Sequence, residues 1–510
     1  MALWSSGEAL AAAGRSKDGD AIARVEGGGQ GMGGGSRGGA SPALTEPPPA
    51  PAGRREALSR LRPDALLLIS LVSVFLLQPA TTIRHLSFWL PVASLSLTVL
   101  AWAATRSKSP IDGPGTRKTA SIMASVVLAI GLSRYLGDGT WLIAARPPAI
   151  LPILVGLALI LFLAVVLLRV GGSHAGIALL AAGLILFLFV ILKTSPLALG
   201  ASRWLRSLSG QEVGLASASD LTWLGFSYIA FRLLHVLRDH ARGALPQVSL
   251  QEFVTYTLFF PSLLAGPIDR IERFVRDLRE PKRGARDLSD GVRRIMAGLF
   301  KKIVLADSLA LISLGPSNVS QVHSAGWTMI LLYAYSFRLY LDFSGYTDIA
   351  VGVARLVGVH LPENFDRPYL KPTPVAFWNS WHITLAQWFR SYYFNPLTRA
   401  LRQSRLRLPD TFVVLVGQVS TMVLIGLWHA VAWNFVVWGI WHGLGLFIVN
   451  RVNVLLRGRR WVGRLASGHS QVVQTVGVLL TFHFVTLGWI WFALPDVRLG
   501  VRVFLRLVGL

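Results

Sequence analysis

Seven stretches of this 510-residue chain are apolar over nearly the length that crosses a lipid bilayer. They are residues 66–77, 86–104, 150–168, 177–192, 413–427, 435–449 and 472–492. A helix needs about 20 such residues to span the hydrocarbon core. In lipid only helices and closed barrels satisfy every backbone N–H and C=O group, and these runs lack the alternation of barrel strands. The pattern therefore predicts an all-α, polytopic integral membrane helical bundle.

More broken apolar stretches extend this prediction. They lie at residues 119–143, 222–236, 250–265, 292–315 and 326–358. Together with the seven continuous runs they give about 10–13 expected membrane segments, judged against the bilayer length.

The composition agrees with a membrane protein and excludes other classes. Hydrophobic residues make up 53% of the chain and charged residues 15%, against about 25% charged in soluble domains. The net charge of +24 comes mostly from short basic connections at 270–302, 399–407 and 451–464, as expected for cytoplasmic loops beside anionic lipid. We therefore expect contact with membrane lipid and no nucleic-acid partner. Cysteine is absent, which excludes a thiolate nucleophile, a disulfide and a cysteine-based metal site.

Residues 1–62 differ from the rest of the chain. They are rich in Gly, Ala, Pro and Arg, with runs such as GGGQGMGGGSRGGA and PPPAPAGRR. Such a composition buries too little apolar surface to form a core. The stretch is also too long before its first apolar run for a standard signal peptide. We predict a disordered cytoplasmic tail, followed by a first helix that acts as a signal anchor.

Three Trp-His pairs stand in or beside the apolar segments: Trp381-His382, Trp428-His429 and Trp441-His442. Basic loops precede the run at 413–427 and follow the run at 435–449. If both loops are cytoplasmic, the two runs form a hairpin whose turn, including His429, lies towards the outer face or at the base of a cavity that opens there.

The residues alone leave two interpretations of these histidines open. Trp and His rings occupy interfacial belts, whereas an ionisable group inside a membrane segment is by default a functional candidate. Imidazole is the natural proton carrier near neutral pH. Metal binding is not supported, because His429 and His442 are thirteen residues apart, about 220° around a helix, and no carboxylate completes a site.

Several segments in a fixed order resemble the bacterial branch of the membrane-bound O-acyltransferase family, which includes alginate O-acetylases and D-alanyl transferases of teichoic acid. They are FFPSLLAGPIDRIERF, GLFKKIVLADSLA, the run from LDFSGYTD to FWNSWHITLAQWFRSYYFNPL, GLWHAVAWNFVVWGIWHGL and TFHFVTLGWIWFAL. The resemblance divides the chain into N-terminal transmembrane helices at 63–222, an acyltransferase core at 223–494 and a C-terminal segment at 495–510.

The resemblance implies transfer of an acyl group from a thioester to a hydroxyl. The family's hallmark histidine falls on His429, which is then the general base. Its other polar position falls on His382, which then orients the acceptor, polarises the carbonyl or relays the proton. General-base help of this kind is typically worth roughly 10²–10⁴-fold. His442 and His483 are expected to be packed, hydrogen-bonded core residues.

Other polar residues near these motifs are candidates for substrate binding. Asn379, Trp381 and Arg390 lie in the segment 374–396, which is too polar to face lipid. It forms the wall of a central tunnel as a re-entrant segment, or it is an amphipathic helix on the membrane surface. Trp428 joins this set as the neighbour of His429.

Two further sets of polar residues each allow a functional and a structural interpretation. Asp342 and Tyr346, in LDFSGYTD, line the acceptor path or belong to a helix cap or break. The basic residues Arg270, Lys301 and Lys302 meet an anionic donor or mark only the topology.

The chain departs from the family branch after Arg390. Ser391 stands where Asp is common, and Pro396-Leu397-Thr398-Arg399 replaces a Pro-Leu-Gly-Gly turn. The identity of the donor therefore stays open between acetyl-CoA and an acyl carrier, each of which would be an acyl thioester co-substrate. We expect no bound cofactor and no metal.

We expect a multi-pass O-acyltransferase of the bacterial plasma (inner) membrane that acetylates an extracytoplasmic polysaccharide or glycolipid. Relatives often work with a separate extracytoplasmic acyl-handling protein, which makes such a protein an expected partner. The alternatives are D-alanyl transfer to a teichoic-acid-like polymer and, from another class, a transporter of lipid-linked glycans. Transporters tend to contain internal repeats, and none is visible in this sequence.

Overall fold

The computed structural model describes residues 63–106, 113–136, 143–170, 175–281, 284–456 and 470–509. Within these ranges the chain is helical, with one isolated β-bridge, between Phe365 and Trp381, and no named strand. The all-α prediction is therefore confirmed. The predicted tail at 1–62 and part of the basic loop at 451–464 lie outside the described residues.

The α-helices cover nearly all of the seven apolar runs and also form in more polar stretches. They are α3 (Pro63–Leu76), α4 (Leu86–Thr105), α5 (Pro114–Leu132), α6 (Ile150–Val170), α7 (Ala175–Lys193), α8 (Ser195–Leu208), α9 (Phe226–Ala241), α10 (Leu250–Thr257), α11 (Ile271–Arg279), α12 (Ala285–Leu299), α13 (Asp307–Ala310), α14 (Ala325–Leu356), α15 (Pro374–Trp378), α16 (Ile383–Phe389), α17 (Asn395–Gln403), α18 (Asp410–His429), α19 (Trp433–Leu456), α21 (Ser470–Ala493) and α22 (Val497–Leu507).

Short 3₁₀-helices and two π-helical stretches join these elements. The 3₁₀-helices include η3 (Ala218–Leu221), η4 (Phe260–Ser262) and η6 (Pro368–Leu370). The π-helices are η5 (Phe300–Ala306), after α12, and η7 (Arg390–Phe394), after α16. Such π-bulges are frequent at functional sites.

In the described part of the chain, six helices are long and apolar enough to cross a membrane: α4, α6, α7, α18, α19 and α21. The shorter α3 is also apolar. The other predicted segments are helical as well, but they are shorter or carry more polar residues, as α14 does. The total of about 10–13 membrane segments, counted from the bilayer length, remains a prediction.

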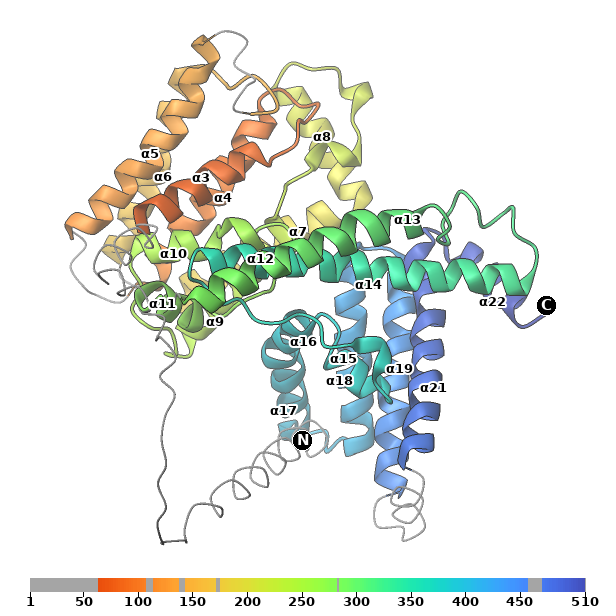
Figure 1. The fold of residues 1–510 in the computed structure, drawn as a ribbon. Coiled ribbons are helices and arrows are strands. Elements are labelled where there is room, and N and C mark those ends of the chain that lie inside the picture. The colour runs from red at the N-terminus through yellow and green to blue at the C-terminus, as the bar shows by residue number, and fades with distance from the viewer. Residues whose placement is uncertain are drawn as a thin grey trace, which may run out of the picture.

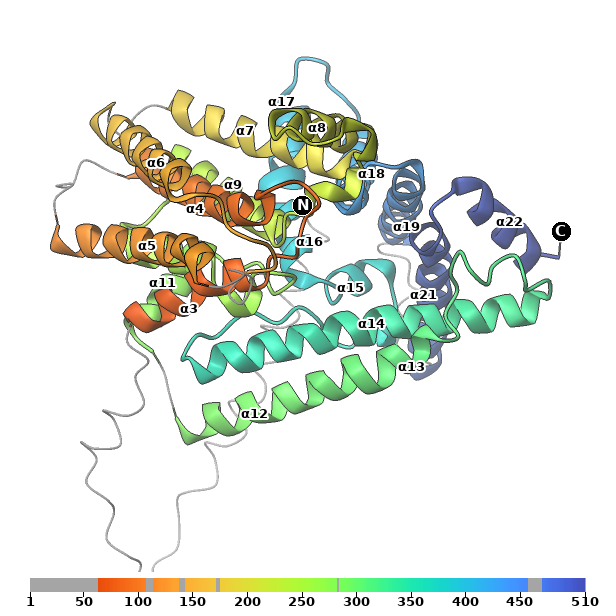
Figure 2. The ribbon, with the colours of Figure 1, turned by 90° about the horizontal axis from the view of Figure 1, so that it is seen from above.

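The helices form two groups joined by a long antiparallel pair. Figure 1 shows α18, α19 and α21 side by side, with α12 and α14 running together across one end of them. In Figure 2 the N-terminal helices α3 to α7 lie on one side of α14, and α21 and α22 lie at its far end.

Small residues bring the paired helices close together. A Cβ added to Gly298 of α12 would lie 2.5 Å from the carbonyl oxygen of Gly345 in α14. In the hairpin of α18 and α19, a Cβ on Gly439 would lie 2.4 Å from Cα of Val423. Glycine lets the backbones approach where apolar lipid provides no hydrophobic drive for association. The contact at Gly439 therefore sets the spacing between α18 and α19.

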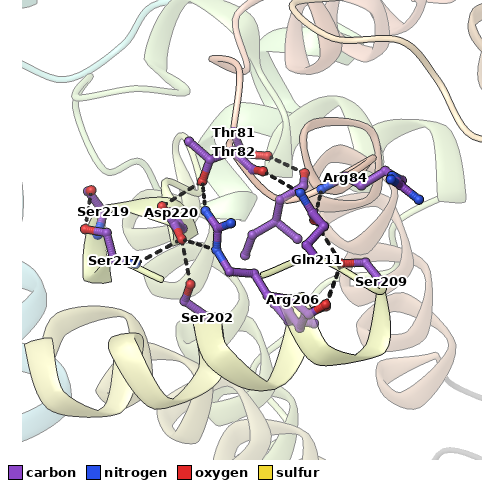
Figure 3. Close-up of polar contacts among 12 residues, drawn as sticks. Thr81, Thr82, Arg84, Ser202, Arg206, Ser209, Gln211, Ser217, Ser219 and Asp220 are labelled. Carbon is purple, nitrogen blue, oxygen red and sulfur yellow. Dashed lines mark hydrogen bonds and ion pairs between the residues drawn. The ribbon is translucent and has the colours of Figure 1, made fainter. Parts of the chain in front are cut away.

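A polar cluster attaches α8 to the loop between α3 and α4 (Figure 3). Asp220 of η3 accepts hydrogen bonds from Ser202, Thr82 and Arg206, at 2.6, 2.7 and 3.0 Å. The side chains of Arg206 and Asp220 are only 5% and 4% exposed. Because a buried carboxylate is costly unless it is paired and hydrogen-bonded, this cluster fixes where the chain turns after α8.

Candidate active site

His429 is the last residue of α18, and its ring is surrounded by aromatic side chains. The ring centroids lie 4.4 Å from Trp428, 4.7 Å from Phe492 and 5.8 Å from Phe435. The position of Phe435 depends on Gly426, where an added Cβ would lie 2.3 Å from the Phe435 carbonyl oxygen. The hairpin thus holds a half-buried imidazole between apolar walls, next to the short turn from Ala430 to Ala432.

The end of α7 docks on this turn. The N–H of Val431 donates to the carbonyl oxygen of Lys193 at 2.9 Å, and the Lys193 ammonium lies 3.4 Å from the His429 carbonyl oxygen. The ammonium also lies 6.0 Å from the centre of the Trp428 ring. Sequence reasoning missed Lys193, because a lysine at the end of an apolar helix is usually explained by topology alone.

His382 contacts the same indole and has a strained backbone conformation. It stands just before α16 with φ 44° and ψ 51°, in the left-handed region that residues with a Cβ seldom adopt. Backbone pairing holds it there. The N–H of Asp366 donates to Ser380, and that of Ile383 donates to Asn364, both at 3.0 Å. Such strain of about 1–3 kcal/mol persists only where the surroundings impose it, and it clusters at functional sites.

The His382 ring is 3% exposed and has one polar neighbour among the described residues. Its Nδ1 lies 3.3 Å from Oδ1 of Asn364, whose side chain is fully buried. Its Nε2 is buried without a hydrogen-bond partner in the described structure. Asn364 is a second residue that sequence reasoning missed. The signal available for it was its place in the HLPENFDRPY stretch of the resemblance.

Trp428 connects the two histidines. Its ring centroid lies 6.0 Å from His382 and 4.4 Å from His429. The structure therefore brings together three of the predicted site residues, His382, Trp428 and His429, from two separate segments of the chain.

The remaining predicted residues lie elsewhere. Asn379 is exposed at the end of α15, and Trp381 is packed in the aromatic core, with its ring 5.2 Å from Trp489. Arg390 begins the π-helix η7 and lines a small cavity of about 30 Å³ beside Gln418. Their roles in substrate binding remain predictions.

Two candidates on α14 have structural contacts. Asp342 forms an ion pair with Lys302, and Tyr346 donates to the carbonyl oxygen of Pro261 at 3.4 Å. Lys301 similarly contacts Asp348, at 2.6 Å. These contacts join η5 and the loop at η4 to α14.

The other two histidines differ from each other. His483 is hydrogen-bonded as expected, with Nε2 2.8 Å from the Tyr333 hydroxyl and Nδ1 2.7 Å from the Leu479 carbonyl oxygen. His442 is fully buried against Trp438, but neither ring nitrogen has a partner among the described residues. His442 thus has the expected burial but no hydrogen bond among the described residues, whereas the half-buried His483 has the expected hydrogen bonds.

A polar cavity of about 170 Å³ adjoins the His382 segment. Thr384 lines it and also donates to Asn364 at 2.7 Å. The polar residues around it are His235, Asp269, Arg270, Arg273, Gln387 and Tyr392. Burial raises the pKa of Asp269 to about 6, against the opposing effect of Arg273. No group of three or more His, Asp or Glu side chains arranged for a metal ion occurs in the described ranges.

Comparison with known proteins decides the class. The model of the membrane-bound O-acyltransferase family matches residues 177–459, more than half of the chain. This chain belongs to the membrane-bound O-acyltransferase family. It is therefore an O-acyltransferase and a multi-pass membrane protein, which favours catalysis over the glycan-transporter alternative. The match starts within α7, so Lys193 is inside it.

Three relatives are bacterial. A teichoic acid D-alanyltransferase from Streptococcus thermophilus is 31% identical over 54% of this chain and 69% of its own length. A probable alginate O-acetylase from Azotobacter vinelandii is 31% identical over 55% of this chain and 52% of its own length. A peptidoglycan O-acetyltransferase from Helicobacter pylori is 30% identical over 51% of this chain and 48% of its own length. The similarity spans about half the length of the last two relatives.

Proposed function

We propose that this protein transfers an acyl group, most simply acetyl, from a thioester to hydroxyls of an extracytoplasmic polysaccharide or glycolipid. The observation that carries the proposal is that the rings of His382 and His429 both contact the indole of Trp428. Of two imidazoles beside one apolar ring, one can accept the proton of a hydroxyl while the other holds the acceptor.

His429 acts as the general base in this proposal. A neutral imidazole takes the proton from the acceptor hydroxyl while the oxygen attacks the thioester carbonyl. The tetrahedral intermediate then collapses, the C–S bond breaks, and the proton passes from His429 to the departing thiolate. Base catalysis accounts for roughly 10²–10⁴-fold, and holding donor and acceptor together adds a proximity contribution. The apolar rings around His429 keep water from competing with the acceptor.

The polar cavity beside Thr384 suits the polar arm of a thioester donor. Two of its lining residues each have a buried side-chain atom without a partner in the described structure, His235 Nε2 and Asp269 Oδ2. The amide and hydroxyl groups of a carrier arm would donate to such atoms. Arg270, exposed at the cavity, would meet the phosphate of the same arm. Arg270→Gln is expected to raise the KM for the donor several-fold and to leave the KM for the acceptor unchanged.

D-alanyl transfer to a teichoic-acid-like polymer is the second candidate. The teichoic acid D-alanyltransferase from Streptococcus thermophilus, 69% of whose length is matched, favours it. The alginate and peptidoglycan relatives favour acetyl. The two reactions use the same hydroxyl attack on a thioester, so the active site is unchanged between them.

The proposal includes a location and partners. The chain would lie in the bacterial plasma (inner) membrane, in contact with membrane lipid, and accept a donor from the cytoplasm. A separate extracytoplasmic protein would handle the acyl group or the acceptor downstream.

Mass spectrometry of cell-envelope glycans tests the function. The deletion strain is compared with the wild type and with the deletion strain complemented by His429→Ala. Loss of an acetyl mass increment in both mutant strains is expected. Loss of an alanyl increment would select the second candidate. Unchanged glycan esters in the deletion strain would contradict both.

A further inference from the structure

The side-chain amide of Asn364 has an orientation that the backbone decides. Its Oδ1 receives the N–H of Thr384 at 3.2 Å and the hydroxyl of Thr384 at 2.7 Å. A backbone N–H can only donate, so the atom facing Thr384 must be the amide oxygen and not its nitrogen. The alternative orientation of Asn364, with its amide oxygen and nitrogen exchanged, is therefore excluded.

The hydroxyl of Thr384 has one donor partner and one acceptor partner. It accepts the backbone N–H of Ile268 at 3.0 Å and donates its own hydrogen to Asn364. Both donors of Thr384 thus point at the same oxygen. The hydrogen bonds therefore all donate in one direction. The N–H of Ile268 donates to Thr384, and Thr384 donates to Asn364.

This direction determines which nitrogen of His382 carries the proton. Nδ1 of His382 lies 3.3 Å from the same Asn364 oxygen, which cannot donate. Nδ1 therefore carries the hydrogen. A neutral imidazole has only one N–H, so Nε2 has a free lone pair. This atom is buried and has no partner among the described residues.

We propose that Asn364 is a positioning residue that fixes the tautomer of His382, so that Nε2 accepts a hydrogen bond from a hydroxyl of the acceptor. That hydroxyl is not the one that His429 deprotonates. The proposal rests on the proposed function and narrows it. An acceptor with at least two hydroxyls, such as a sugar, fits it, whereas a simple alcohol does not. It also excludes one of the three roles left open for His382. A neutral ring without hydrogen on Nε2 cannot donate to the thioester carbonyl through that atom.

Kinetics of three variants test the positioning role. Asn364→Ala removes the oxygen that holds Nδ1–H, while Asn364→Asp keeps an oxygen acceptor there. We expect Asn364→Ala to raise the KM for the acceptor roughly 5- to 10-fold, the effect of one lost hydrogen bond, with the KM for the donor unchanged. Asn364→Asp is expected to restore most of the acceptor KM. The matched control is Ser380→Ala, which removes a buried hydroxyl of the same segment that bonds only within α15 and its end.

Two kinetic results would overturn the proposal. One is an acceptor KM that is unchanged in Asn364→Ala. The other is an equal loss in Asn364→Ala and Asn364→Asp at wild-type amounts of folded protein.

A second measurement uses the wild-type chain and does not depend on whether variants fold. The ¹⁵N spectrum of histidine-labelled, full-length protein in detergent separates protonated from bare ring nitrogens. The signals of His382 are assigned by their loss in His382→Gln. A protonated Nδ1 with a bare Nε2 supports the proposal, and the reverse pattern overturns it. If this pattern is found in a chain that modifies no glycan, the proposed function fails while the tautomer assignment stands.

Discussion

The indole of Trp428 contacts both imidazoles of the candidate active site. Its ring centroid lies 6.0 Å from that of His382 and 4.4 Å from that of His429. Tyr228 and Phe231 of α9 pack against the indole, with centroids at 6.0 and 5.7 Å. The positions of the two histidines therefore depend on one side chain that contacts both rings and on the helix behind it.

Substitution of Trp428 tests this dependence. Trp428→Leu is expected to lower kcat roughly 10- to 100-fold, because a displacement of about 1 Å at a reacting group can cost about 10²-fold. Trp428→Phe keeps an aromatic ring and is expected to lose less than about 10-fold by the same reasoning. Acyl transfer is measured in membranes with matched protein levels. A Leu variant with wild-type kcat would show that the indole does not position the histidines.

The close contact of α18 and α19 predicts a packing effect. Gly439→Ala would place a methyl group 2.4 Å from Cα of Val423, so the helices must separate. Overpacking of this kind costs about 1–3 kcal/mol, and it would also move His429. We expect a lower Tm in detergent together with reduced activity.

Gly200 provides the matched control for this substitution. It lies within α8, and an added Cβ would meet nothing within 4 Å. Gly200→Ala is expected to raise stability by about 0.5–1 kcal/mol. Equal Tm changes in the two variants would contradict the packing argument.

The sequence predicted the apolar helices and the hairpin that carries His429, because these depend on local hydropathy and on charged loops. It did not predict where His382 lies relative to His429. That relationship depends on the left-handed backbone at His382 and its pairing with Asn364, which are tertiary contacts between separate segments. Lys193 was missed for a similar reason, since its contact with His429 joins residues 236 positions apart.

The Asp220 cluster predicts a pH-dependent contribution to stability. Burial alone would raise the pKa of Asp220, but hydrogen bonds from Ser202, Ser217, Thr82 and Arg206 outweigh it and lower the pKa to about 2, from the usual 3.8. The folded-state pKa is below the unfolded one, so the stabilisation is present above about pH 4 and is lost as pH falls towards 2.

Asp220→Asn checks this prediction. At pH 7 it leaves the buried Arg206 guanidinium without its carboxylate, a loss of about 3–5 kcal/mol. The Tm difference from wild type in detergent should shrink as pH falls from about 4 to about 2. Asp290→Asn is the control. Asp290 is 42% exposed and pairs with Arg293, which is 78% exposed, and at 3.6 Å with Arg355, so its loss is expected to cost less than about 1 kcal/mol. A Tm difference that stays constant with pH would contradict the pKa assignment.

The pairing of Lys302 with Asp342 predicts a structural and not a donor-binding role. Their side chains are 39% and 46% exposed, so the pair contributes about 0–1 kcal/mol. Lys302→Gln and Asp342→Asn are both expected to leave the KM for the donor unchanged. A several-fold rise in donor KM for Lys302→Gln alone would instead assign the lysine to the donor.

The most direct test of the account compares acyl transfer by membranes containing His429→Ala with transfer by wild-type membranes at equal expression. His483→Ala is the matched control, because His483 bonds Tyr333 and Leu479 away from the site. We expect acyl transfer to fall at least about 10²-fold in His429→Ala and to stay near normal in His483→Ala. Wild-type transfer by His429→Ala would contradict the assignment of His429 as the base.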